Sequence, residues 1–147
     1  MEYADIIMAI SAFIAMIGVC VMAWESKLQV DIAQTAFEDN INEQYREIAR
    51  GIPVESLLGG RADSQHWLEA RELIYNYIDQ CNQKVLLYRT GRVRTDTWKR
   101  WSLDIWQHMQ NPDFIQVWEE IKAANVLTFK HFKMLEDNHY YWTVRKI

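Results

Sequence analysis

The chain has 147 residues, 50% of them hydrophobic, with 16 basic and 20 acidic side chains and a formal net charge of -4. This length suits one folded domain with a short additional segment and excludes two full domains. The near balance of charge is atypical of a dedicated nucleic-acid-binding protein, so we expect no DNA partner. Two cysteines, Cys20 and Cys81, give no disulfide framework.

An uncharged and almost wholly apolar run occupies Ile6–Trp24. As a helix rising ~1.5 Å per residue, this run is about 28 Å long, close to the hydrocarbon thickness of a bilayer. A buried helix of a soluble protein is rarely apolar on all sides over such a length. The sequence therefore predicts an all-α protein with a transmembrane anchor over residues 1–25 and a helical domain over residues 26–147.

One half of the predicted anchor carries small or flexible side chains, and bulky ones occupy the other half. Small side chains let helix backbones approach closely in a membrane. Either this half packs on other copies of the chain, as we expect, or it reflects the ordinary abundance of alanine and glycine in membrane spans. A face this wide offers contact on two flanks, as a closed ring requires. The predicted oligomer seam, at steps of three and four residues, is Met8, Ser11, Ala15, Gly18 and Met22.

The charges that flank the anchor predict its orientation. Glu2 and Asp5 precede it, whereas every lysine and arginine follows it. The positive-inside rule then places the N-terminus outside and the helical domain in the cytoplasm. A signal peptide has a basic start and a cleavage site between small residues, and this segment has neither, so we expect an uncleaved anchor.

The first part of the helical domain continues the anchor. Apolar residues over 25–50 recur at helical spacing, and no glycine or proline separates this segment from the anchor. Gly51 and Pro53 are placed to end the helix. Residues 51–62 are predicted to form a loop with one short turn at Val54–Leu58.

The remaining chain predicts further helices, for a bundle of four or five in all. Asp63 or Ser64 is placed to cap a helix that ends near Thr90, and Thr95 or Asp96 to cap the next. Proline after a capping asparagine marks another start. The predicted segments are 64–90, 96–109, a helix from Pro112, a helical continuation over 126–137, and a coil or short extended piece over 139–147.

Catalytic and metal-binding signatures are missing from the sequence. It has no phosphate-binding glycine loop, no nucleophile elbow and no HExxH, and its four histidines lack the spacing of metal ligands. Cys81 falls on an apolar helix face, which favours a small buried residue over a nucleophile. We therefore expect a non-enzymatic protein without cofactor or metal.

Arg61 and His66 form the one pattern with a catalytic interpretation. Their Arg-x4-His spacing occurs in helical ribonucleases of the HEPN type, where the imidazole is the acid/base and the guanidinium steadies the phosphate. Here the pattern straddles a loop and a predicted helix cap, and such spacing often arises by chance. The ribonuclease interpretation of Arg61 and His66 is therefore weaker than the non-enzymatic one.

Two polar clusters remain in the helical domain. The first is predicted to form a hydrogen-bonded layer between helices or subunits, or to line a cavity; its members are Asn76, Asp79, Asn82 and Gln83. The second is basic and lies over 89–100, whereas 31–55 is acidic. The basic cluster is a solvated face, a contact for anionic lipid or RNA, or a partner for the acidic face of a neighbouring subunit. The last interpretation predicts a charge-pair interface of Glu43, Glu47, Arg89, Arg92 and Arg94.

Several stretches together resemble a group of small bacterial single-pass membrane proteins of unassigned function. They are FEDNINEQYREIARGIP, LLGG, YNYIDQCNQKVLLYRTGRV, a TW..W pair and NPDFIQVWEEI, and they follow a short N-terminal anchor in this order, so the resemblance runs along nearly the whole chain. In layout the chain is also similar to the membrane accessory of type VI-B CRISPR systems, which works with an RNA-guided nuclease. That family combines an N-terminal membrane helix with a cytoplasmic helical domain in a ring-shaped, pore-like homo-oligomer.

The resemblance implies a homo-oligomer in the bacterial inner membrane that acts as a pore or membrane-perturbing accessory in antiviral defence. Its implied partners are further copies of itself, membrane lipids and an RNA-guided nuclease system. Two alternatives stay open. One is a membrane-tethered scaffold that recruits a cytosolic partner through residues 89–100; the other is a HEPN-like ribonuclease that uses Arg61 and His66.

Overall fold

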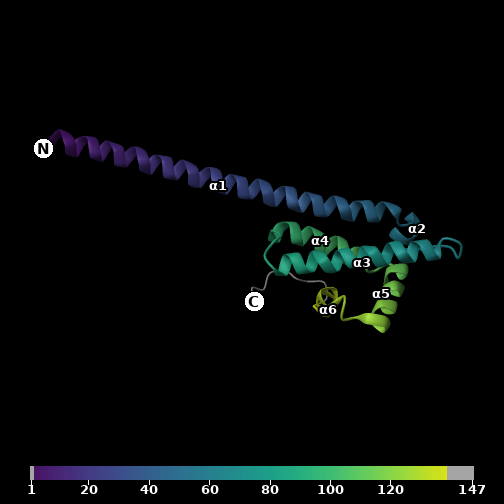
Figure 1. The fold of residues 1–147 in the computed structure, drawn as a ribbon. Coiled ribbons are helices and arrows are strands. Elements are labelled where there is room, and N and C mark those ends of the chain that lie inside the picture. The colour runs from purple at the N-terminus through teal and green to yellow at the C-terminus, as the bar shows by residue number, and fades with distance from the viewer. Residues whose placement is uncertain (1, 139–147) are drawn as a thin grey trace. The chain divides into compact units, whose positions relative to one another are not determined.

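The structure, a computed structural model, describes residues 2–138 and is entirely helical within them, which confirms the predicted fold class. The expectation for the tail 139–147 lies outside the described residues. The helices are α1 (Glu2–Gly51), α2 (Val54–Leu57), α3 (Trp67–Arg89), α4 (Thr95–His108), α5 (Pro112–Asn125) and α6 (Lys130–Asp137), as Figure 1 shows.

Helix α1 is one uninterrupted helix of 50 residues. It is long and apolar enough to cross a membrane, by length and composition. Every side chain over 3–33 is exposed. The chain divides after Phe37 into two units, so the C-terminal part of α1 belongs to the second unit. The end of the apolar run at Trp24 and the start of the packed bundle at Glu38 are therefore different points along α1.

Helix α3 lies at the centre of the second unit and contacts α4, α5 and α6 (Figure 1). Its buried face carries Ile74, Ile78, Cys81 and Val85, each fully buried. This spacing of three and four residues is the apolar periodicity of an amphipathic helix. Aromatic side chains from the neighbouring helices complete the core.

The cap of α4 differs from the prediction. Thr95 and Asp96 lie inside the helix, and Arg94 occupies the cap position without a side-chain cap bond. The backbone N–H of Arg94 instead donates to Glu38 Oε1 on α1, at 2.7 Å. The sequence-based assignment was wrong because the capping acceptor comes from another helix rather than from the residues beside the cap.

The loop between α1 and α3 is held by the start of α5. The buried carboxylate of Asp113 accepts hydrogen bonds from Ser56 Oγ at 2.5 Å and from the Ala62 backbone N–H at 2.8 Å. Asn111 Nδ2 donates to the Leu57 carbonyl at 3.0 Å. Burial of these polar groups is therefore accompanied by hydrogen bonding, which fixes the loop on the bundle.

Candidate functional site

Arg61 and His66 have separate partners. Arg61 Nη1 donates to Gln116 Oε1 on α5 at 3.5 Å, whereas His66 Nδ1 lies 2.8 Å from Asp63 Oδ1. Backbone and side-chain hydrogen bonds from His66 lower the pKa of the Asp63 carboxyl. Asp63 therefore orders the turn before α3, and the histidine and arginine are each used in local structure.

Among residues 2–138, Asn82 is the member of the predicted polar layer that joins two helices. Asn82 is buried, and its Oδ1 accepts hydrogen bonds from the backbone N–H groups of His131 and Phe132 at 3.1 and 3.0 Å. Its Nδ2 donates to the Thr128 carbonyl at 3.3 Å. These bonds satisfy N–H groups at the start of α6, which have no partner within their own helix.

The other three members of the polar layer lie nearer the surface. Asn76 is exposed, and Gln83 Nε2 donates to Asp79 Oδ2 within α3 at 3.2 Å. The layer is thus a single cross-helix asparagine with a local pair beside it on α3.

Two of the predicted charge-pair residues, Glu43 and Arg89, have side-chain contacts within their own chain. Glu43 pairs with Arg46 and Arg50 on its own helix, at 4.0 and 3.5 Å. Arg89 contacts His131 and Met134 on α6. Glu47 and Arg92 are exposed. A pairing of these residues between subunits stays a prediction.

Arg94 has a partner in its own chain that the sequence analysis missed. Its guanidinium binds both carboxylate oxygens of Glu38, with the shortest contact, Nη2 to Oε2, at 2.8 Å. Thr97 Oγ1 donates to the same carboxylate at 2.7 Å. The Glu38 side chain is 4% exposed, and the negative charge lies at the positive N-terminus of α4.

These bonds also set the ionisation of Glu38. Burial alone would raise the pKa of this carboxyl, but the hydrogen bonds from Arg94 and Thr97 outweigh burial and lower it. The Glu38–Arg94 pair therefore fixes the first packed residue of α1 onto the start of α4.

A second feature missed from sequence is the buried Lys84 on α3, which is 1% exposed. Its Nζ lies 3.2 Å from the ring centroid of Tyr45 on α1 and 4.5 Å from that of Trp101 on α4. Ring faces attract a cation and replace part of its lost hydration. Burial still lowers the pKa of Lys84 to about 8, with Cys81, Asp104 and Arg46 as the neighbouring charged or titratable groups.

A short chain of polar groups runs beside Lys84. The hydroxyls of Tyr45 and Tyr77 are hydrogen-bonded to each other. His108 Nδ1 lies 2.9 Å from the Tyr77 hydroxyl and 2.8 Å from the Asp104 carbonyl oxygen. Because a carbonyl only accepts, we place the imidazole hydrogen on Nδ1. The network joins α1, α3 and α4 through side chains.

The pH dependence of folding should reveal Lys84. Its folded pKa of about 8 lies below its ordinary value of 10.5, so the unfolded chain binds more protons between these values. Lys84 should thus add about 1 kcal/mol to the free energy of unfolding from pH 8 to 9. Denaturant titration of the full chain in detergent, followed by tryptophan fluorescence, measures this.

Lys84→Met is the control for this pH effect, because it removes the titrating group. Burial raises the pKa of Cys81 from 9.0 to about 12, so the unfolded thiol loses its proton first and acts in the opposite direction within this window as well. Because this effect is common to both proteins, the difference between the wild-type and methionine profiles isolates the lysine. An equal change from pH 8 to 9 in the two proteins would contradict the assignment.

The buried Tyr45–Tyr77–His108 network beside Lys84 holds three helices together. The side chains of Tyr45, Tyr77, Cys81 and Lys84 are all buried between the helices. Within residues 2–138, no group of three or more His, Cys, Asp and Glu side chains could hold a metal ion. The exposed feature of the described chain is instead the apolar surface of α1.

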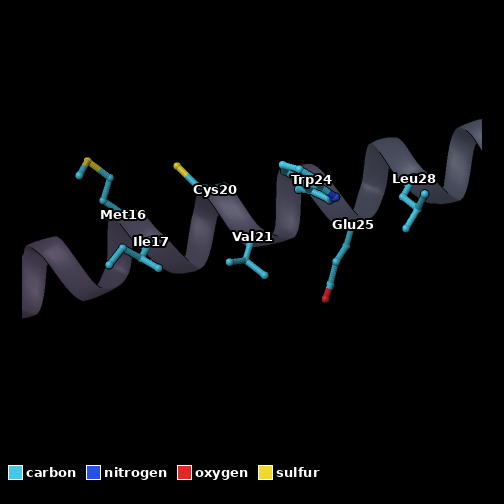
Figure 2. A pocket seen from close by; sticks show the side chains of 7 residues that line it. All are labelled: Met16, Ile17, Cys20, Val21, Trp24, Glu25 and Leu28. Carbon is cyan, nitrogen blue, oxygen red and sulfur yellow. The ribbon is translucent and has the colours of Figure 1, made fainter.

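The predicted oligomer seam lies on this exposed surface. Each of its five residues is exposed, and a Cβ built at Gly18 meets no atom within 4 Å. A different side of the helix carries an open apolar hollow from Met16 to Leu28 (Figure 2).

Comparison with known protein families, curated proteins and solved structures finds no match for the chain.

Proposed function

We propose that the chain is a single-pass protein of the bacterial inner membrane that assembles with copies of itself through its N-terminal helix. The N-terminus lies outside, and the bundle lies in the cytoplasm. In this proposal the assembly forms a pore or otherwise perturbs the membrane as a non-enzymatic accessory in antiviral defence. The similarity in layout to the membrane accessory of type VI-B CRISPR systems supports the defence role.

The observation that carries the membrane part of the proposal is the uninterrupted helix α1. Its apolar segment is exposed on all sides, although exposed apolar surface of this extent is unfavourable in water. A bilayer covers such a segment, and packing between copies covers its small face. The flanking charges support the orientation, since all basic residues follow the segment.

Gly18→Ile tests the self-association. The space around a Cβ at position 18 is open, and the substitution makes the segment more apolar, so insertion should persist. A branched side chain in the seam should hold neighbouring backbones apart and lower the assembled fraction about tenfold, equivalent to roughly 1.4 kcal/mol. Native mass spectrometry from mild detergent measures the assembled fraction.

Cys20→Ile is the matched control for Gly18→Ile, because it adds a similar side chain two residues away, at an exposed position about 160° around the helix from the centre of the seam. We expect it to leave assembly unchanged. Equal loss of assembly in both variants, or in neither, would count against the seam.

A second candidate function is a tethered scaffold. The α3–α4 turn exposes Arg92, and Arg100 is exposed on the first turns of α4. These side chains are placed to contact an acidic cytosolic partner or a neighbouring subunit's acidic face. We do not extend the proposal to ribonuclease activity, because Arg61 and His66 bind different neighbours instead of sharing one site.

A further inference from the structure

The bulky side of α1 does not end where its uncharged segment ends. Steps of four, three, four and four residues link Ile17, Val21, Trp24, Leu28 and Ile32 into one apolar stripe. These side chains are between 48% and 75% exposed. The hollow of Figure 2 lies along this stripe, and Trp24 and Leu28 form its end toward the bundle.

Lipid does not cover the whole stripe. Glu25, Lys27 and Asp31 mark the water side of the segment. Ile32 lies eight residues after Trp24, or about 12 Å along the helix, whereas the headgroup region is only about 5–8 Å thick on each side. Ile32 therefore lies beyond the bilayer, with 60% of its surface exposed.

A surface that covers the stripe must present apolar residues along one continuous side, both within the membrane and beyond it. A parallel copy of α1 meets this requirement, because equal residues then lie at equal depth. The charges beside the stripe agree with a parallel copy: Glu25 lies on one flank and Lys27 on the other, so neighbouring copies bring unlike charges together.

We propose that the Ile17–Ile32 stripe packs against α1 of a second copy and extends the contact between copies beyond the membrane. This inference rests on the proposed self-association and adds a contact face separate from the seam at Gly18. Bulky side chains in the stripe would interdigitate as in a coiled coil, whereas small residues in the seam permit close backbone approach.

Cysteine cross-linking of the full chain in native membranes tests the stripe. The background carries Cys20→Ser, and Cys81 stays because it is buried. Leu28→Cys and Ile32→Cys should each give about tenfold more oxidised dimer than Val30→Cys, since a disulfide requires Cα atoms within about 7 Å. Val30 is the matched control, because it is 61% exposed but points to the opposite side of the helix.

Gly18→Cys in the same background separates this inference from the proposed self-association. Dimer at Gly18 without dimer at Leu28 and Ile32 would overturn the stripe and leave self-association standing. Equal dimer at Val30 and Leu28 would overturn the stripe as well. Absence of dimer at all four positions would overturn both proposals.

Discussion

Arg94→Ala should lower the free energy of unfolding of the bundle by about 1.5–3 kcal/mol, because the hydrogen bonds of its half-exposed guanidinium to a charged carboxylate are lost. The charge left behind is the carboxylate of Glu38, whose side chain is 4% exposed. Thr97 and the backbone N–H at position 94 still donate to it, but the guanidinium contacts are lost. Denaturant titration of the full chain in detergent measures the change.

Arg92→Ala is the matched control, two residues away and exposed. It should change the free energy of unfolding by less than about 0.5 kcal/mol. If Arg94 acted only between subunits, its substitution would weaken assembly and leave the unfolding of the bundle unchanged. That outcome would contradict the structural role given to the Glu38–Arg94 pair.

Acid should also weaken this pair. The folded pKa of Glu38 lies below its ordinary value of 4.5, so the stabilisation is fully present above that value. It is lost as the pH falls through the lowered folded pKa.

Trp118→Ala should cost about 3–5 kcal/mol, because it removes a large buried side chain and leaves a cavity. Trp118 is 2% exposed, and its ring meets that of Phe132 edge-on at a centroid distance of 4.8 Å. Its Nε1 donates to Glu136 Oε1 at 2.9 Å. The substitution therefore removes a contact between α5 and α6 as well as core volume.

Trp106→Ala provides the comparison for Trp118, since Trp106 lies on α4 and is 38% exposed. We expect a loss of about 1 kcal/mol or less there. Thermal unfolding followed by far-ultraviolet circular dichroism ranks the two variants, and a larger loss at Trp106 would show that the core is wrongly placed.

Local signals predicted most of the fold. Pro112 begins α5 as expected, and Gly91, with φ of 72°, follows the end of α3 in the left-handed region that glycine tolerates. The apolar spacing of α3 likewise placed Cys81 in the core, where it is fully buried. Each of these signals acts within a few residues of the element that it predicts.

The contacts of Glu38 with the start of α4, and of Lys84 with its two aromatic rings, were not predicted because the partners are distant in sequence. Glu38 caps α4 from 56 positions earlier in the chain, and no local pattern distinguishes it from the other acids of α1. Lys84 does stand at helical spacing from Cys81 and Tyr88, on the buried side of α3. The rings that hold it come from α1 and α4, and only tertiary packing brings them to it.

The mass of the full chain, released into mild detergent and measured by native mass spectrometry, tests the central claim most directly. Self-association through α1 predicts a discrete assembly of several copies, reduced by Gly18→Ile and retained in Cys20→Ile. A single 17.5 kDa species at every concentration and salt would contradict the claim.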